Sequence, residues 1–306
     1  MNQDFDVAII GAGPAGLSAA IYLRRYNLTC CIIEKMAPGG TLLKIDSIEN
    51  YPGFEKIKGF ELATNMYNQA IHLDTEYISG EVVDIEVKKD YKIIKTKTQE
   101  ITCRGVILAT GRVPRSLGLT EEEKLVGKGI SYCATCDGPL FKNESVAVVG
   151  GGNSAFEEAL YLSDICKKVT IIHHNDSIKA DPIIYEKVKS RQNIKILLQT
   201  DVKKYLLKDS YLDGLELVDQ KSKKNKKLKV KGCFLFIGQI PDNLNFQKLG
   251  IVDENGYIDV DENYKTRIDG IYAVGDTIKK SVYQVVTAAS EGAIAATNLS
   301  KELRRK

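Results

Sequence analysis

Two cysteines separated by two residues, Cys133 and Cys136, are followed at once by an acidic residue, Asp137. A CxxC pair can cycle between a dithiol and a disulfide, and a neighbouring carboxylic acid can carry the proton that thiolate chemistry requires. The other interpretations are half of a zinc site or two buried thiols. Because zinc needs four ligands and the sequence has neither a second CxxC nor a His-x-Cys pair, we expect a redox pair and no metal.

A glycine cluster near the start of the chain predicts a dinucleotide site. Gly11, Gly13 and Gly16 form a GxGxxG pattern between an apolar run and a helix. The first glycine allows a tight turn, the second lets backbone approach a pyrophosphate, and the third lets helix and strand pack closely. Glu34 ends the next strand at the spacing expected of a residue that accepts hydrogen bonds from a ribose.

The same pattern recurs about 139 residues later, with Gly150, Gly152 and Ala155 after the apolar residues 145–149. The repeat predicts an α/β protein with two Rossmann-like (three-layer ββα) dinucleotide-binding domains. Residues 270–276 resemble a return strand of the first domain, so we expect the second domain to be inserted into the first. The predicted domains are residues 1–114 with 244–306, and residues 115–243, joined by connecting strands at 112–115 and 238–242.

Length and composition limit the classes of protein to which the chain can belong. At 306 residues it is long enough for two domains with separate cores. A formal net charge of +3 is too small to indicate a nucleic-acid partner, and no apolar run approaches the roughly 20 residues that span a bilayer. Because residues 1–6 lead into a strand without the features of a secretory signal, we expect a cytoplasmic protein.

Two further compositional features leave alternatives open. Seven cysteines, an odd number, argue against a framework of structural disulfides in a reducing compartment. Residues 221–231 contain seven lysines. This run is interpreted either as an exposed hairpin turn or as a docking patch for an acidic protein.

The order of these motifs resembles that of the small, low-molecular-weight thioredoxin reductases along essentially the whole chain. The matching segments are the GxGxxG pattern and residues 49–53, 109–111, 129–138, 275–276 and 284–289. The resemblance implies FAD bound by the discontinuous domain, a homodimer, and thioredoxin or a thioredoxin-like protein as the substrate. It also implies that Cys136 faces the flavin, that Cys133 attacks the partner's disulfide, and that Asp137 donates and accepts the proton.

The resemblance further implies which residues contact FAD. They are Gly11, Gly13, Pro14, Ala15, Gly16, Glu34, Lys35, Gly40, Thr41, Asn50, Val83, Ala109, Thr110, Gly111, Gly275, Asp276, Tyr283, Gln284 and Val285. Thr41 and Tyr283 depart from the family, which usually has glutamine and arginine there. Tyr283 could stack on the flavin and cover the face that nicotinamide would use, or it could simply be exposed at the surface.

The sequence departs most from the family after the second glycine cluster. NADPH-dependent members have a His-Arg-Arg-x-x-x-Arg pattern whose arginines hold the 2′-phosphate. In this chain His174 and Asn175 replace the arginine pair, and Lys179 replaces the third arginine. A lysine or a neutral histidine does not reproduce bidentate guanidinium contacts, so we expect NADPH to bind poorly.

Four functions remain at this point. The sequence favours a thioredoxin reductase whose donor is reduced ferredoxin, as in the ferredoxin-dependent members that the chain resembles in lacking the arginines. The alternatives are a thioredoxin reductase that uses NADH and one that uses NADPH, since the GxGxxA pattern at Gly150 is intact. A ferredoxin:NADP reductase of the same fold would have no use for a dithiol at Cys133 and Cys136.

Overall fold

The structure is a computed structural model that describes residues 3–45 and 47–305. The chain divides into two compact units. The first is formed by Met1–Val113 and Pro241–Lys306, and the second by Pro114–Ile240. The second unit is therefore an insertion in the first, and it ends at Ile240 rather than at the expected residue 243.

Asn243 explains the difference at this boundary. Its amide oxygen accepts hydrogen bonds from the hydroxyls of Thr110 and Thr277 at 2.8 and 2.7 Å, and its amide nitrogen donates to the carbonyl of Gly256 at 2.9 Å. The side chain is almost completely buried. An asparagine two residues after a proline is typical of a linker, but here it belongs to the core of the first unit.

The first unit is built on a seven-stranded sheet with the order β3-β2-β1-β6-β5-β4, in which β17 also pairs with β6. The strands are β1 (Phe5–Ile10), β2 (Cys30–Glu34), β3 (Glu76–Ser79), β4 (Val82–Val87), β5 (Lys92–Thr96), β6 (Glu100–Leu108) and β17 (Ile271–Ala273). Strand β17 runs parallel to β6, so the return strand predicted at residues 270–276 is confirmed. The strands β4 and β5 are antiparallel to their neighbours.

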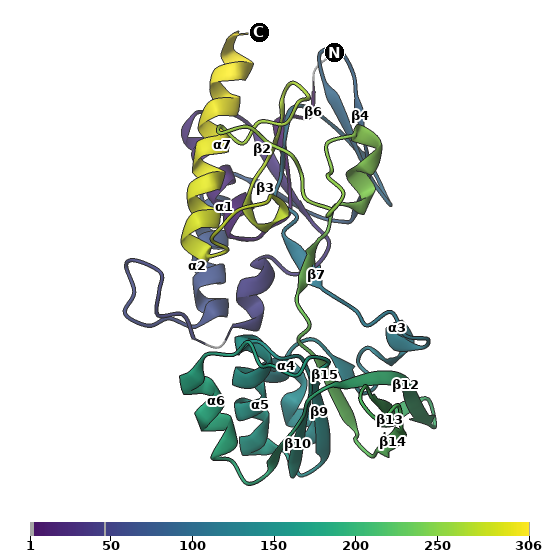
Figure 1. Cartoon of the computed structure of the whole chain (residues 1–306). Helices are drawn as coiled ribbons and strands as arrows, with labels where there is room; N and C mark the ends of the chain where they lie inside the picture. Colours follow the sequence, from purple (N-terminus) through teal and green to yellow (C-terminus); the bar gives the residue numbers. More distant parts are fainter. Residues whose placement is uncertain (1–2, 46, 306) are drawn as a thin grey trace. The chain divides into compact units, whose positions relative to one another are not determined.

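Helices α1 (Pro14–Arg25), α2 (Gly59–Ile71) and α7 (Val285–Arg305) share one hydrophobic core with the sheet of the first unit. Figure 1 shows α7 running alongside α1. The two helices approach closely at Gly292, where an added Cβ would lie 2.1 Å from the carbonyl oxygen of Ala15. Short 3₁₀ helices cover Gly40–Lys44, Leu244–Leu249 and Gly275–Thr277.

The second unit has three layers. Its central sheet is parallel with the order β11-β10-β9-β15-β8, and a second, antiparallel sheet has the order β12-β13-β14. The strands are β8 (Ile130–Ser131), β9 (Ser145–Val149), β10 (Lys168–Ile172), β11 (Ile194–Leu197), β12 (Thr200–Lys208), β13 (Tyr211–Asp219), β14 (Asn225–Leu228) and β15 (Gly232–Leu235). The helices are α3 (Glu122–Leu125), α4 (Ala134–Asp137), α5 (Asn153–Ile165) and α6 (Pro182–Lys189), with a 3₁₀ turn at Gly138–Phe141.

Both faces of this central sheet are buried, as the continuous apolar run of β9 predicts. On one face Val146 and Val148 pack with Phe156 of α5. On the other face Ala147 and Val149 pack with residues of the antiparallel sheet. The second unit is therefore a sheet between a layer of helices and a second sheet, which is the ββα arrangement expected from the sequence.

The two crossings between the units are short strands, β7 (Arg112–Pro114) and β16 (Gln239–Pro241), which pair with each other. Directly beyond them, the amide of Arg115 donates to the carbonyl of Gly238 at 3.0 Å. The connecting strands predicted at 112–115 and 238–242 are thus confirmed.

Lysines 221–231 begin in the turn between β13 and β14 and continue through β14. Their side chains are exposed. The run therefore forms an exposed hairpin that covers a whole strand as well as the turn, and this exposure fits both interpretations. In the part of the chain that the structure describes, no helix is both long and apolar enough to cross a membrane.

Candidate active site and cofactor site

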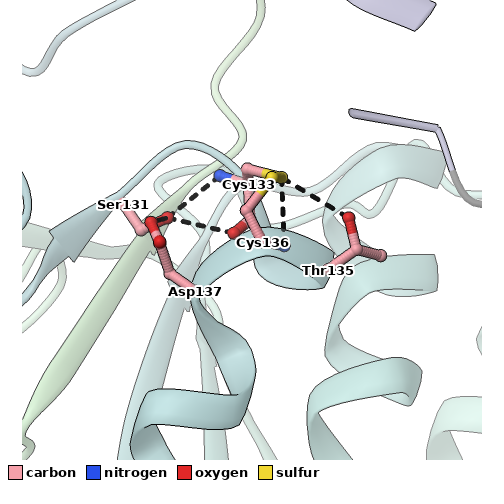
Figure 2. The surroundings of a disulfide bond; sticks show 5 residues. All are labelled: Ser131, Cys133, Thr135, Cys136 and Asp137. Carbon is pink, nitrogen blue, oxygen red and sulfur yellow. Dashed lines mark hydrogen bonds between the residues drawn. A yellow bond between two sulfur atoms is a disulfide. The ribbon is translucent and has the colours of Figure 1, made fainter. Parts of the chain in front are cut away.

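The CxxC pair lies where strand β8 ends and the short helix α4 begins. Cys133 and Cys136 form a disulfide with an S–S distance of 2.06 Å and a Cα–Cα distance of 5.3 Å (Figure 2). The sequence prediction of a redox pair is consistent with this bond, because one helical turn brings the two sulfurs within bonding distance. Within residues 3–45 and 47–305, no cluster of three or more His, Cys, Asp or Glu side chains could hold a metal ion.

The two sulfurs have different environments. Cys133 Sγ accepts a hydrogen bond from the backbone N–H of Cys136 at 3.2 Å and lies 3.4 Å from the hydroxyl of Thr135. Such donors stabilise a thiolate, so the geometry favours Cys133 as the nucleophile. Accessibility instead favours Cys136, because Cys136 is exposed and Cys133 is buried.

Asp137 is the last residue of α4, and its carboxylate accepts a hydrogen bond from the hydroxyl of Ser131 at 2.6 Å. The same hydroxyl accepts from the backbone N–H of Cys133 at 3.0 Å (Figure 2). Ser131 thus joins the acid to the backbone of the first cysteine. Ser131 was not among the predicted site residues, although a serine two positions before the CxxC pair was a usable signal.

The other five cysteines, Cys30, Cys31, Cys103, Cys166 and Cys233, are free and buried. Burial raises the pKa of every one of these thiols, for example to about 11 for Cys30 and Cys166. A buried thiol with a raised pKa is a poor nucleophile. Cys136 of the CxxC pair is therefore the one exposed cysteine among the described residues.

A buried carboxylate, Glu122 of α3, also supports the loop and was not among the predicted site residues. It accepts hydrogen bonds from the hydroxyls of Tyr132 and Tyr205 at 2.9 and 3.0 Å and from the amide of Leu117 at 3.1 Å. Burial raises the pKa of both tyrosines, which therefore stay protonated and continue to donate. Because Tyr132 precedes Cys133, this network fixes the start of the CxxC loop.

In the first unit, predicted segments that are far apart in sequence meet at the carboxyl ends of β1 and β6. An added Cβ on Gly11 would lie 2.3 Å from the carbonyl oxygen of Ala109, and one on Gly40 would lie 3.2 Å from Gly13 Cα. A Cβ on Gly275 would meet that of Ala15 at 3.0 Å. The carboxyl ends of parallel strands are where open α/β sheets bind nucleotides.

A pocket opens at this edge of the sheet. Its lining includes Gly11, Glu34, Lys35 and Thr110. Glu34 already accepts two backbone hydrogen bonds, from the amides of Ala12 at 2.8 Å and Met36 at 2.9 Å. It therefore closes the glycine loop in addition to any contact with a ribose.

The glycine loop provides a cradle of the shape that a pyrophosphate requires. An added Cβ would clash with backbone at Gly11 and at Gly16, whereas none would meet any described atom within 4 Å at Gly13. Gly13 therefore faces open space directly before the N-terminus of α1, where backbone N–H groups favour an anion.

Asp276 and its neighbours Lys280 and Tyr283 have partners that the sequence did not predict. The guanidinium of Arg112 lies 3.1 Å from its carboxylate and 3.9 Å from the centre of the Tyr283 ring. Lys280 bonds both carboxylate oxygens of Glu291 at 2.9 Å, and Glu291 also accepts from the amide of Gly275 at 2.7 Å. Tyr283 is therefore only partly exposed, and the guanidinium of Arg112 packs on its ring.

The remaining predicted contact residues are placed unevenly. Asn50 donates to the side chain of Gln284 at 3.1 Å, which brings these two together. Val83 follows Val82, a residue of the pocket lining, but its own side chain is exposed, as is that of Thr41.

The second glycine loop keeps the geometry of a nucleotide site. Gly150 has φ +149°, and an added Cβ there would lie 2.4 Å from the carbonyl oxygen of Phe236. Gly152, before the N-terminus of α5, faces open space. The amide of Lys179 donates to the carbonyl of Gly151 at 2.8 Å, which holds the Lys179 segment beside the loop.

His173 covers Gly151, because its ring atoms lie where a Cβ on that glycine would be. Its Nε2 is 3.1 Å from the carbonyl oxygen of Ser177, and burial lowers its pKa, so the ring is neutral at pH 7. The side chains of His174 and Lys179 are exposed. Two of the three residues that replace the expected arginines are thus accessible from the solvent beside the loop.

Comparison with known proteins identifies the family. The model of the pyridine nucleotide-disulphide oxidoreductases matches residues 5–292. The thioredoxin reductase of Ureaplasma parvum is 41% identical over 307 residues, covering 100% of this chain and 99% of that protein. This chain belongs to the thioredoxin reductase family. It is accordingly a flavoprotein, with FAD as its cofactor.

Solved structures of thioredoxin reductases have the same fold. That of Lactococcus lactis has a TM-score of 0.91 and 37% identity, and covers 99% of this chain and 100% of that chain. A ferredoxin-flavin thioredoxin reductase from Clostridium acetobutylicum has a TM-score of 0.55 and 30% identity, with 99% of each chain covered. The two Rossmann-like domains expected from the sequence are therefore confirmed.

The residues of the first unit fit FAD. The open cradle at Gly13 suits a pyrophosphate, and Glu34 lines the adjoining pocket with a carboxylate. Arg112 Nε is buried and has no hydrogen-bond partner among the described residues, so this edge of the sheet offers a donor beside Asp276. An unpaired buried donor of this kind is expected where a polar ligand binds.

Proposed function

We propose that this chain is a thioredoxin reductase that uses the Cys133 and Cys136 dithiol and takes its electrons from a reduced nicotinamide dinucleotide bound by the second unit. The observation that carries the proposal is the CxxC disulfide beside Asp137, whose Cys136 is exposed, in a chain whose five free thiols are all buried. Bound FAD supplies two-electron transfer between a nicotinamide and a disulfide.

The chain's own residues account for the disulfide exchange. After the disulfide accepts two electrons, Cys133 is the sulfur whose thiolate is stabilised, by the N–H of Cys136 and the hydroxyl of Thr135. It attacks one sulfur of the partner's disulfide, and the other sulfur leaves as a thiolate and takes a proton from Asp137. Cys136 then attacks the mixed disulfide, which re-forms the bond to Cys133 and releases the reduced partner.

The donor assignment follows from the second glycine loop. Gly150, Gly152 and the buried Ala155 form a nucleotide cradle at the N-terminus of α5, and a full-length relative 41% identical is named a thioredoxin reductase without mention of ferredoxin. Of the three positions where arginines were expected, one has a lysine, Lys179, and none has an arginine. We therefore propose that NADH is used at least as well as NADPH.

Reduced ferredoxin, the donor favoured from the sequence, is the second candidate. The observation that favours it is the replacement of the arginine pair by His174 and Asn175, together with the 30% identity to the ferredoxin-flavin enzyme. The chain is more similar to relatives named simply as thioredoxin reductases, and this similarity supports a nicotinamide donor more than it supports ferredoxin.

We propose a homodimer as the assembly, from the family resemblance alone.

The donor can be tested by flavin bleaching without oxygen. NADH, NADPH and reduced ferredoxin are added separately to the purified protein, and we expect rapid bleaching by NADH. A triple variant, His174→Arg with Asn175→Arg and Lys179→Arg, should bind NADPH roughly a hundredfold more tightly. The reason is that each guanidinium–phosphate contact contributes about 1.5–3 kcal/mol. The same variant is a matched control, since its rate with NADH should change little. Bleaching by ferredoxin and by neither nucleotide would overturn the nicotinamide assignment.

A further inference from the structure

Ser131 lies at a point of the fold that permits little movement. It ends strand β8, where its backbone pairs in parallel with Phe234 of β15. The residue is 3% exposed. Its side chain reaches both the backbone of Cys133 and the carboxylate of Asp137, as Figure 2 shows. A buried, paired strand therefore holds a hydroxyl against the residue that we propose as the proton donor.

The hydroxyl of Ser131 has one proton and two acceptors within reach. The carboxylate of Asp137 is 2.6 Å away and the carbonyl oxygen of Cys133 is 3.1 Å away. The same oxygen accepts a hydrogen bond from the amide of Cys133 at 3.0 Å. A distance of 2.6 Å is typical of a hydroxyl that donates to an ionised carboxylate. While Asp137 is ionised, the serine proton therefore points to it.

The second acceptor matters when Asp137 is protonated. The acid then becomes a donor, and the oxygen of Ser131 has a lone pair to accept its proton. The serine can turn its own proton to the carbonyl of Cys133, which lies on the same side of the loop. Every donor and acceptor is satisfied in both states, and the change needs only rotation of one hydroxyl.

We propose that Ser131 is a positioning residue that keeps Asp137 hydrogen-bonded in both of its protonation states, so that the acid can release and regain a proton beside the disulfide without moving. The proposal rests on the proposed function. In that reaction one proton passes from Asp137 to the departing thiolate, and the carboxylate later takes a proton from water. A serine that only shaped the loop would need its bonds to the Cys133 backbone and no contact with Asp137.

The test measures thiol–disulfide exchange directly, without an electron donor or thioredoxin. The full-length FAD protein is reduced chemically, freed of reductant, and mixed with a dialkyl disulfide, whose departing alkyl thiolate needs a proton. Rates are recorded across the neutral pH range for the parent, Ser131→Ala, Ser131→Thr, Asp137→Asn and the double variant Ser131→Ala with Asp137→Asn.

We expect Ser131→Ala to slow exchange by roughly tenfold, the size of one lost hydrogen bond to a charged group. The contact of 2.6 Å with the Asp137 carboxylate is lost in Ser131→Ala, so the shape of the rate–pH curve should change as well as its height. Ser131→Thr, which keeps the hydroxyl, should restore the parent curve. In the Asp137→Asn background, removal of the serine should change the rate by less than about twofold.

Equal loss in both backgrounds, or a curve that is lowered without change of shape, would show that Ser131 only maintains the loop. Flavin content and thermal stability are measured for each variant, and loss of either identifies a variant that fails to fold. If Ser131→Ala fails to fold, the exchange rates of Ser131→Thr and Asp137→Asn still decide the outcome. Failure of the parent to reduce thioredoxin would count against the proposed function. The exchange rates of the parent and the variants with the dialkyl disulfide do not depend on that result, and they test the role of Ser131 separately.

Discussion

At the scale of single residues, the two active-site cysteines are chemically unlike, although the sequence presents them as a symmetrical pair. Cys133 accepts an amide hydrogen bond and lies beside the hydroxyl of Thr135, whereas Cys136 is the exposed sulfur. The hydrogen-bond donors favour Cys133 as the better thiolate, whereas exposure favours Cys136 as the sulfur that a protein partner can reach. Protein disulfide exchange depends on both properties.

We predict that Cys136→Ser traps thioredoxin as a mixed disulfide through Cys133, because the thiol that would resolve it is missing. Cys133→Ser should form no such complex, and both variants should lose at least about 10³-fold in turnover. Non-reducing electrophoresis followed by mass analysis of the linked peptides identifies the sulfur that is bound. A complex linked through Cys136 would reverse the assignment of the two cysteines.

At the scale of elements, the glycine loop between β1 and α1 combines two requirements that the sequence pattern does not separate. Gly11 is fixed by the fold, since its φ of +106° and the nearby carbonyl of Ala109 leave no room for a side chain. Gly13 has no such neighbour, so its lack of a side chain is needed only if a ligand approaches.

The pair Gly11→Ala and Gly13→Ala therefore separates folding from binding. We expect Gly11→Ala to destabilise the protein by about 2–4 kcal/mol, through strain and a clash with backbone. Gly13→Ala should unfold like the parent once flavin is removed, yet bind FAD at least about tenfold more weakly. Thermal unfolding and flavin titration of the two apoproteins measure this. Normal FAD affinity in Gly13→Ala would mean that the cofactor does not use this cradle.

Helix α5 has a buried carboxyl group that the proposed chemistry does not use. Glu158 Oε2 has no hydrogen-bond partner among the described residues, and burial, with a smaller contribution from the charge of Glu157, raises its pKa from 4.5 to about 7. The folded chain therefore holds this proton at a pH where the unfolded chain has released it. Its contribution to stability is complete below about pH 4.5, declines as the pH rises to about 7, and is constant above that.

We predict that Glu158→Gln stabilises the protein at about pH 8 by on the order of 1 kcal/mol and has little effect near pH 4.5. Glu157→Gln is the matched control, because Glu157 is the exposed neighbour on the same helix. The measurement is denaturant unfolding of the three proteins against pH. A stability difference between Glu158→Gln and the parent that does not vary with pH would contradict the raised pKa.

At the scale of the whole molecule, the chain consists of two units that are each complete in their cores. Each of the four clusters of buried hydrophobic residues draws its members from one unit. The second unit begins and ends in the paired strands β7 and β16, so its two ends lie together. A unit with its own core and adjacent ends meets the physical requirements of an independent domain.

We accordingly predict that residues 114–240, expressed alone, fold cooperatively and form the disulfide between Cys133 and Cys136 without binding flavin. The reason is that the Glu122 network and both cores around the central sheet lie within this segment. Denaturant unfolding with a count of free thiols tests it. A fragment without a cooperative transition would show that the inserted unit depends on the first one.

The sequence by itself determined the fold, the insertion and the redox pair, because each depends on local patterns. Apolar runs followed by glycines predict strand, turn and helix, and CxxC spacing brings two sulfurs within reach in one helical turn. The predictions that family resemblance added, FAD and thioredoxin reductase, rested on the same short motifs. The donor was less determined, since missing arginines argue against one ligand and do not specify another.

Only the tertiary structure decided which side chains support those motifs. Ser131 and Asp137 are close in sequence, but their contact depends on how strand β8 meets α4. Arg112 reaches Asp276 across more than half of the chain, and Asn243 is buried although its neighbours resemble a linker. Side-chain pairing of this kind is set by packing between distant elements, and a pattern of residue types along one chain does not record it.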